Sequence, residues 1–210
     1  MEALDYKKAY KALYQPKSQP GIIDVPKISF VAVKGQGDPN EEDGAYARAL
    51  SVLYGISFTV KMSYKGARDI EGYFPYVVPP LEGLWWMPDG ESGIDYSRKS
   101  DFCWISMIRL PEFVDQEIFD WAKEAAAKKK KIDTSPAELF CWEEGLCVQA
   151  MHVGPYNDEP ATIARMGDFL TANGYAEDFS QDRFHHEIYL SDPRKIAPEK
   201  CKTVIRHPIK

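Results

Sequence analysis

The stretch KISFVAVKGQGDPNEEDGAYARALSVL, residues 27–53, decides the expected fold. Its first part is rich in β-branched and aromatic residues and ends at Gly35-Gln36-Gly37, which is typical of a strand closed by a turn. Apolar residues then recur at helical spacing up to Gly55, where a left-handed helix C-cap is expected. The stretch therefore predicts a strand, a glycine turn and a helix.

The second half of the chain repeats this order. Residues 146–170, LCVQAMHVGPYNDEPATIARMGDFL, predict a strand ended by Gly-Pro and a helix stopped by Asn173-Gly174. At an offset of 117 residues, Gly37 aligns with Gly154. Further strands are expected at residues 56–64, 81–87, 102–110, 184–190 and 202–209. The sequence thus predicts an α+β fold in which duplicated β-α-β-β modules with antiparallel sheets form a central ligand cleft.

The domain organisation follows from the same pattern. Residues 1–26 are expected to form an arm, made of a short amphipathic helix and a proline-rich extended linker, that packs on the body. Residues 27–210 are expected to form a single domain of two pseudo-repeats, at about 27–110 and 145–210. A helix at about 113–131 would join them, and the lysines at its end suit the negative end of the helix dipole.

Composition narrows the class of protein. The 210 residues carry 26 Lys and Arg against 32 Asp and Glu, and the resulting net charge of −6 speaks against a nucleic-acid partner. No apolar stretch approaches the length of a membrane span or a signal peptide, so no membrane association and a cytoplasmic location are expected. The four cysteines lack metal-ligand spacing and are expected to be reduced thiols. What stands out is the aromatic content of 12 Tyr, 10 Phe and 5 Trp.

Two motifs that often mark a cofactor or metal site do not indicate one here. Gly35-Gln36-Gly37 has Asn40 where a dinucleotide-binding loop needs its third glycine, so it indicates a turn. His185 and His186 are adjacent on a strand and point to opposite faces, so they cannot share a metal. We therefore expect neither a metal site nor an organic cofactor.

Glu187 is the strongest candidate for a functional residue. Strand alternation places it on one face with His185 and Tyr189, and a carboxylate in mid-strand needs exposure, a partner or a function. The same alternation puts Glu82 and Trp86 on one face of their own strand, which suggests a carboxylate among aromatic walls. Such a site binds flat, apolar or cationic molecules, and burial would raise the pKa of the carboxyl toward that of a general base.

Four segments taken together resemble the stand-alone GyrI-like proteins of the SOUL/GyrI small-molecule-binding superfamily. The resemblance covers essentially the whole chain, and its motifs occur in the family's order. They are Leu81–Trp86, Met107–Val114, Glu144–Tyr156 and His185–Pro193.

The resemblance implies two β-α-β-β (SHS2) modules that form a saddle around a cleft with a buried acidic residue, matched here by Glu187. Relatives serve as ligand-sensing domains of multidrug-responsive transcription activators, fused to a helix-turn-helix domain. The N-terminal arm is too short for such a domain, so direct transcriptional activation is not expected. Some stand-alone members hydrolyse cyclopropanoid genotoxins, adding water across the cyclopropane of duocarmycin-like DNA alkylators.

These expectations combine into one functional hypothesis with two alternatives. Glu187 is the expected catalytic base, a tyrosine hydroxyl polarises the substrate carbonyl, and Glu82 is a candidate second acid. The alternatives are non-catalytic binding of aromatic or cationic drugs and, as the family name suggests, inhibition of gyrase. The oligomeric state stays open. The expected aromatic walls of the substrate slot are Trp86, Trp104, Tyr156 and Tyr189.

Overall fold

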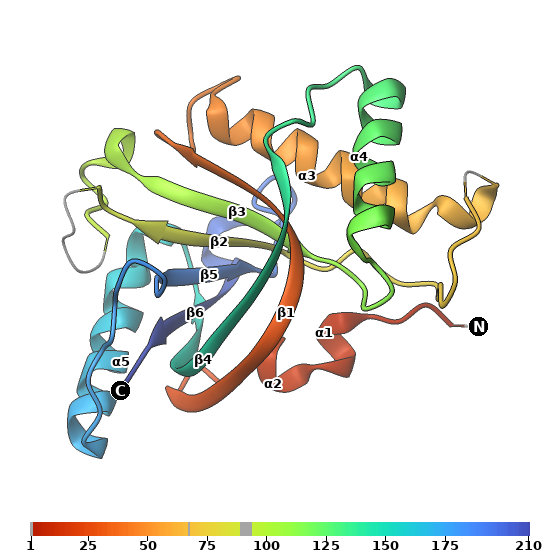
Figure 1. Ribbon diagram of the computed structural model, residues 1–210. Coiled ribbons are helices and arrows are strands. Elements are labelled where there is room, and N and C mark those ends of the chain that lie inside the picture. Colours follow the sequence, from red (N-terminus) through yellow and green to blue (C-terminus); the bar gives the residue numbers. More distant parts are fainter. Residues whose placement is uncertain (1, 67, 89–93) are drawn as a thin grey trace.

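Six strands form a closed antiparallel barrel in which the strand order is β1-β3-β2-β5-β6-β4 (Figure 1). The structure is a computed structural model and describes residues 2–66, 68–88 and 94–210. The predicted α+β class with antiparallel pairing is confirmed. The strands are β1 (Gly21–Gln36), β2 (Leu81–Trp86), β3 (Cys103–Arg109), β4 (Ala137–Val153), β5 (His185–Tyr189) and β6 (Lys202–Pro208).

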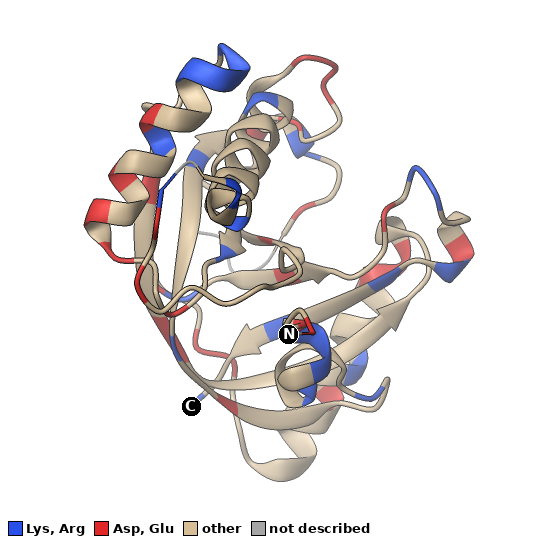
Figure 2. Cartoon of the chain, turned by 90° about the vertical axis from the view of Figure 1, so that its right-hand side faces the viewer, with Lys and Arg blue, Asp and Glu red and all other residues tan. Residues whose placement is uncertain are grey.

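The helices lie outside this barrel (Figure 1). Among the described residues, no helix combines the length and the apolar character needed to cross a lipid bilayer. Figure 2 shows the lysines gathered at one end of α4, as the helix dipole favours. The helices are α1 (Tyr6–Ala9), α2 (Lys11–Tyr14), α3 (Ala45–Lys61), α4 (Gln116–Lys130) and α5 (Glu159–Asn173).

The two halves of the chain have the same order of elements. The first half runs β1, α3, β2 and β3, and the second runs β4, α5, β5 and β6. In each half the first strand pairs with the last, and the last pairs with the middle one. The halves meet where β2 pairs with β5 and where β1 pairs with β4. That the halves arose by duplication stays a prediction.

Two segments differ from the expected elements. Residues 21–26, expected to be linker, begin β1 and pair with β4, and Pro26 is tolerated because that part of β1 has no partner on its other edge. Residues 56–61, expected to be strand, continue α3, so Gly55 lies inside the helix. Their β-branched side chains favour a strand in isolation, but Ile56 and Val60 lie one helical turn apart and both are fully buried.

Each strand presents one face to the barrel interior and the other to the helices. The interior holds an apolar cluster that includes Phe30, Leu84 and Met107. On the helix side, α5 packs on β4 and β6, while α3 packs on β1 and β3. Because α3 and α5 cover different strands of this face, the central strands β2 and β5 lie between them. This arrangement leaves room for a cleft between the two helices.

Gly35 illustrates how closely the helix-side face is packed. It pairs with Trp104 across β1 and β3, and a Cβ on Gly35 would lie 2.3 Å from the indole ring. Only glycine leaves room for that ring. Gly37 then turns the chain with a positive φ of 120°. The Gly35-Gln36-Gly37 motif is therefore a packing and turn feature, as the sequence indicates.

The N-terminal arm lies against the body of the molecule (Figures 1 and 2). The guanidinium of Arg109 lies 4.5 Å from the ring centroid of Tyr6 and 4.4 Å from that of Tyr10. The Gln149 amide donates to the carbonyl of Ala12 at 2.8 Å. A cation close to two aromatic rings is a favourable contact, so the arm is held by specific interactions.

Candidate functional site

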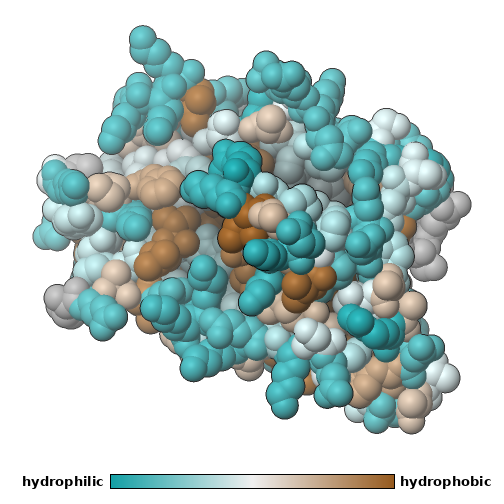
Figure 3. Space-filling view, turned by 180° about the vertical axis from the view of Figure 1, so that it is seen from behind, coloured by the Kyte–Doolittle hydropathy of each residue, from teal (hydrophilic) through white to brown (hydrophobic). Residues whose placement is uncertain are grey.

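A cleft of about 1020 Å³ opens between α3 and the start of α5, over the helix-side face of β2 and β5. Seen from behind, the molecule shows apolar patches near the middle of an otherwise largely hydrophilic surface (Figure 3). Two large apolar side chains of α3 that line the cleft, Tyr54 and Phe58, are 38% and 47% exposed. The main aromatic and acidic residues of the lining are Tyr46, Trp85, Tyr96, Tyr156, Glu159, Glu187 and Tyr189.

The pairing register of β2 and β5 decides which side chains reach the cleft. Gly83 lies opposite Glu187, and Trp85 lies opposite His185. A Cβ on Gly83 would lie 2.5 Å from the Trp85 indole nitrogen and 3.1 Å from the Tyr189 hydroxyl. The missing side chain thus lets the Trp85 indole N–H donate to the Tyr189 hydroxyl at 2.9 Å. The hydrogen-bonded side chains of Trp85 and Tyr189 thus line the cleft beside Gly83.

The aromatic walls are held by contacts between rings. The Tyr46 ring lies 5.4 Å from Trp85 and 5.1 Å, edge-on, from Trp104. The Tyr156 and Tyr189 rings meet edge to face, with centroids 5.9 Å apart. Such pairs stabilise one arrangement of the rings, so the slot is formed before any ligand enters.

The phenol groups of these tyrosines remain protonated at neutral pH. Burial raises the pKa of Tyr46 and of Tyr189, and the negative charge on Glu187 raises both further. The pKa of Tyr156 rises to about 12, mainly through burial. Each hydroxyl therefore keeps its proton and can act as a hydrogen-bond donor.

Glu187 is an ionised carboxylate held in a buried position. It is only 7% exposed, and its Oε1 lies 2.8 Å from Nε2 of His185. Burial by itself would raise the pKa of Glu187, but the hydrogen bond and the positive charge of His185 outweigh it and hold that pKa below the usual range. The sequence-based expectation of a raised pKa at Glu187 is therefore wrong, because His185, which alternation places on the same face, hydrogen-bonds the carboxylate.

Glu159, at the start of α5, is a second cleft carboxyl that sequence reasoning missed. It is fully buried, and its Oε2 accepts a hydrogen bond from the Tyr96 hydroxyl at 3.1 Å. Its Oε1 has no hydrogen-bond partner among the described residues. Burial and the charge on Glu187 raise the pKa of Glu159 to about 10. Because the pKa of Glu159 is raised while that of Glu187 is lowered, Glu159 is the carboxyl that carries a proton at neutral pH and Glu187 is the one that is ionised.

Replacing Glu159 by glutamine is expected to stabilise the folded protein at neutral pH. The pKa of Glu159 is raised from 4.5 to about 10 on folding, so folding takes up a proton between these pH values and stability falls as the pH rises. Glutamine removes this cost, which we expect to add about 2 kcal/mol to the free energy of unfolding at pH 7 and less at pH 5. Urea denaturation at both pH values measures it.

The matched control for this prediction is Glu199→Gln, because Glu199 is exposed. It should leave the urea midpoint unchanged at both pH values. A Glu159→Gln gain that is the same at pH 5 and pH 7 would contradict the assigned protonation state, since the expected difference comes from a proton taken up on folding.

Three ligand-type atoms meet on the cleft floor. One atom each of Glu159, His185 and Glu187 lies within 4.8 Å of the others, close enough to surround a single ion. The atoms of His185 and Glu187 are already joined by the 2.8 Å hydrogen bond, which accounts for their closeness. The expectation that the chain needs no metal stays a prediction.

The structure separates the sequence-predicted site residues into two groups. Glu187, Tyr189 and Tyr156 line the cleft together. Trp104 lies behind the wall, 1% exposed, where it supports Tyr46. The placement of Glu82 and Trp86 in the cleft is wrong.

The pairing register of β2 and β5 explains why Glu82 and Trp86 lie outside the cleft. Glu82 lies opposite Ile188, so Glu82 and Trp86 share the barrel interior and Trp85 takes the cleft position. The Trp86 ring packs against Phe184 at 4.8 Å. The alternation of side chains along β2 is as predicted. The face that carries Glu82 and Trp86, however, points into the barrel, and the face that carries Trp85 points into the cleft.

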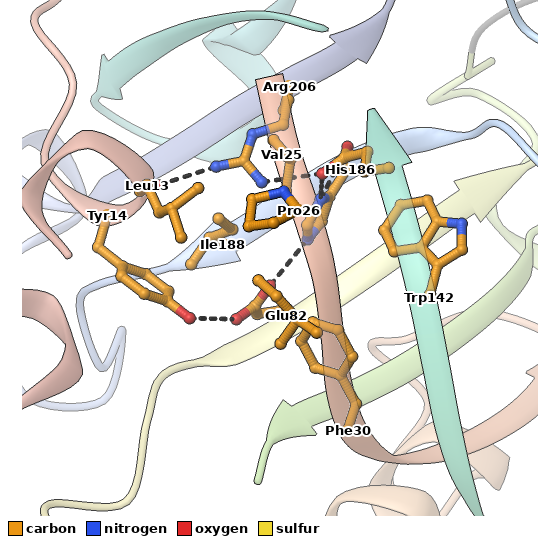
Figure 4. Close-up of a pocket in the computed structure, with 12 residues that line it drawn as sticks. Leu13, Tyr14, Val25, Pro26, Phe30, Glu82, Trp142, His186, Ile188 and Arg206 are labelled. Carbon is orange, nitrogen blue, oxygen red and sulfur yellow. Dashed lines mark hydrogen bonds and ion pairs between the residues drawn. The ribbon is translucent and has the colours of Figure 1, made fainter. Parts of the chain in front are cut away.

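Glu82 belongs to a separate charged network inside the barrel (Figure 4). His186 lies between two carboxylates, with Nε2 3.0 Å from Glu82 and Nδ1 3.1 Å from Glu144. Arg206 donates to Glu144 at 2.9 Å, and the Tyr14 hydroxyl donates to Glu82 at 3.3 Å. The space among these residues is about 10 Å³, at most one water, so the network is structural.

The family model for the GyrI-like small molecule binding domain matches residues 18–210. The chain belongs to this family. A GyrI-like domain with its aromatic, acidic cleft between α3 and α5 is thus a small-molecule-binding domain, as the sequence resemblance implies. No functionally curated protein matches the sequence.

Solved structures similar to this GyrI-like chain include two from Listeria innocua. One, an uncharacterized conserved protein, is 47% identical with a TM-score of 0.92 and covers 99% of this chain and 100% of its own. The other, a hydrolase, is 45% identical with a TM-score of 0.91 and covers 100% of both chains. The EcmrR C-terminal domain, at 12% identity and a TM-score of 0.55, covers 91% of this chain and 97% of its own and is similar in fold alone.

Proposed function

We propose that the protein is a cofactor-free hydrolase that opens the cyclopropane ring of planar aromatic DNA-alkylating compounds. The observation that carries the proposal is an ionised, buried carboxylate, Glu187, at the floor of an aromatic cleft lined by neutral phenols. A flat, apolar electrophile fits such a slot, and water beside the carboxylate gains a base. The similarity to a Listeria hydrolase at 45% identity supports the reaction class.

The proposed reaction adds one water molecule. Glu187 takes a proton from water as the water oxygen bonds to the CH₂ carbon of the cyclopropane. The bond between this CH₂ carbon and the dienone ring carbon breaks, and its electron pair moves through the conjugated ring to the carbonyl oxygen. A tyrosine hydroxyl, from Tyr46, Tyr156 or Tyr189, hydrogen-bonds that oxygen as its negative charge develops. Glu159 donates its proton to the resulting phenolate and the proton on Glu187 then passes to Glu159, so both carboxyls regain their starting states and one water has been added.

The two cleft carboxyls suit different steps. Glu187 is ionised and accepts the proton, whereas Glu159 is protonated and offers a donor from its unpartnered Oε1. Pairs of acids whose pKa values are driven apart by their surroundings are a recurring means of acid–base catalysis. In this proposal Glu159 takes the second-acid role that the sequence assigned to Glu82.

A turnover assay with the purified protein tests the proposal. A compound with a cyclopropane fused to a cross-conjugated dienone should be consumed with multiple turnovers, and its product should gain the mass of one water. Addition of EDTA should leave the rate unchanged. If the compound binds stoichiometrically but is never consumed, the enzyme proposal is wrong and non-catalytic sequestration of aromatic or cationic drugs is the better description.

A further inference from the structure

A line of hydrogen bonds joins Glu187 to three side chains outside the cleft lining. Glu187 Oε1 lies 2.8 Å from His185 Nε2, and His185 Nδ1 lies 2.7 Å from His207 Nε2. His207 Nδ1 in turn lies 2.7 Å from Oε1 of Glu177. Among the described residues that line the cleft, Glu187 is the only member of this line. The other three therefore act on the cleft through Glu187.

Strand geometry places these residues in line. His185 and Glu187 are two residues apart on β5 and share its helix-side face. The β5–β6 register brings His207 beside His185, with ring centroids 4.9 Å apart. Glu177 comes from the segment that forms a bridge with Ile209, directly after β6.

The hydrogen-bond partners determine which ring nitrogens carry protons. Glu187 is ionised, and the hydrogen bond from His207 lowers the pKa of Glu177. An ionised carboxylate can only accept, so His185 carries a proton on Nε2 and His207 carries one on Nδ1. The two remaining nitrogens face each other at 2.7 Å, where two lone pairs would repel, so one of them is protonated as well. The two rings thus hold three protons and one positive charge.

The third proton lies on Nδ1 of His185. Burial and the positive charge of His185 lower the pKa of His207 in spite of its hydrogen bond to Glu177, so His207 is the neutral ring. Because His207 Nδ1–H donates to Glu177, its Nε2 is left as an acceptor for His185 Nδ1–H. Glu177 therefore supports the charge on His185 through the tautomer of His207.

The charged ring is buried and depends on its neighbours. His185 and His207 are each 2% exposed, and the Phe179 ring packs on His207 with centroids 4.9 Å apart. The Glu177 side chain is 38% exposed, and the negative charge of Glu144, on β4, also acts on His207. A buried charge is stable only beside such partners, so loss of the Glu177 charge should weaken the hold on the third proton.

The two cleft carboxyls differ in their relation to this cation. His185 hydrogen-bonds Glu187 directly, whereas Glu159 accepts from the neutral Tyr96 hydroxyl. We propose that the cation on His185, supported by His207 and Glu177, decides which cleft carboxyl carries the proton, keeping it on Glu159 and leaving Glu187 ionised. This inference rests on the proposed function, in which Glu187 must start each turnover as a base.

The same charge restores the site after a turnover. At that point Glu187 holds the proton taken from water, and Glu159 has given its own to the product. One oxygen of each carboxyl lies within 4.8 Å of the other, and the cation favours transfer from Glu187 to Glu159 because it stabilises ionised Glu187. Only this proton moves, and those on the two histidines stay in place. His207 and Glu177 are therefore positioning residues.

The experiment compares Glu177→Gln with Glu199→Gln, the same change at an exposed position. The glutamine oxygen can still accept from His207, so the contact is kept while the negative charge is lost. More of the Glu177→Gln protein should then have a neutral His185 at pH 8. We expect kcat for the cyclopropane-dienone compound to fall about 10-fold at pH 8 with KM unchanged, and to stay within about twofold of the wild type at pH 6. Glu199→Gln should match the wild type at both pH values.

Histidine ¹⁵N NMR measures the charge without any substrate. In the wild type at pH 7, both ring nitrogens of His185 should have the shifts of a protonated imidazolium, whereas Nε2 of His207 should have that of an unprotonated acceptor. Raising the pH to 8 should move the His185 signals toward those of a neutral ring further in Glu177→Gln than in the wild type or in Glu199→Gln.

A loss of rate in Glu177→Gln that is equal at pH 6 and pH 8, or no loss at all, would overturn the inference. So would a wild-type His185 that is neutral at pH 7. Inactivation by EDTA that zinc reverses would overturn it too, because His185 Nε2 would then bind a metal in place of its proton. If the wild type consumes no substrate, the proposed function fails, and the NMR comparison decides the charge of His185 on its own.

Discussion

The Glu187→Gln variant is expected to lose turnover of a cyclopropane-dienone compound by about 10³-fold while still binding it. Glutamine has nearly the shape of glutamate and keeps an oxygen that can accept from His185, but its amide cannot take a proton from water. The aromatic walls do not depend on the carboxylate charge, so the dissociation constant should change little. Steady-state turnover and fluorescence quenching of the cleft tryptophan, Trp85, measure the two quantities.

The pH dependence of turnover provides a second test of the role of Glu187. His185 holds the pKa of Glu187 below its usual range, so the wild-type rate should persist as the pH falls to the ordinary carboxyl range and decline only below it. Glu138→Gln, at an exposed position of β4, is the control and should keep the wild-type rate. A Glu187→Gln variant with near wild-type turnover would show that another group activates the water.

Much of the architecture could be predicted from the sequence, because it depends on local patterns. The positions of β3, β5, β6 and the C-terminal end of α5 at Gly174 agree with the expected elements within a residue or two. The face shared by His185, Glu187 and Tyr189 is also as alternation predicts. The periodicity of apolar residues depends only on the residues within one element, so it can be recognised directly in the sequence.

The sequence does not show how the elements pair and pack against one another. Alternation shows that Glu82 and Trp86 share a face, but only the register, with Gly83 opposite Glu187, shows that this face is not the cleft. A shift of one residue would have exchanged Trp85 and Trp86. Glu159 was missed for a related reason, because an acid at a helix start is ordinarily explained by the helix dipole. Its burial against Glu187 arises only when α5 packs beside β5.

The second large effect is expected in the barrel interior. Arg206→Met should reduce the free energy of unfolding by about 3–5 kcal/mol, because it leaves buried charge without its partner. The Arg206 side chain is 2% exposed, and it donates to Glu144, to Gln149 and to the carbonyl of Leu13. Burial alone would raise the pKa of Glu144, but the charges of His186 and Arg206 outweigh it and lower that pKa to about 2.

The same substitution should also change how acid unfolds the protein. A carboxyl with a lowered pKa contributes stability above about pH 4.5 and loses it as the pH falls toward 2. Without Arg206 the pKa of Glu144 rises, so this contribution shrinks at neutral pH and is lost at a higher pH. Urea denaturation at pH 7 and acid titration followed by circular dichroism measure both changes.

Arg206→Met should, in addition, loosen the N-terminal arm, since the Leu13 carbonyl loses its donor. Trypsin should then cut after Lys11 or Lys17 faster than in the wild type, before the barrel is digested. Arg194→Met removes an ion pair with Asp192 at an exposed position and is the matched control, for which little change is expected. If Arg206→Met is as stable as the control, the interior network does not hold the arm, and apolar packing of Leu13 and Tyr14 must anchor it instead.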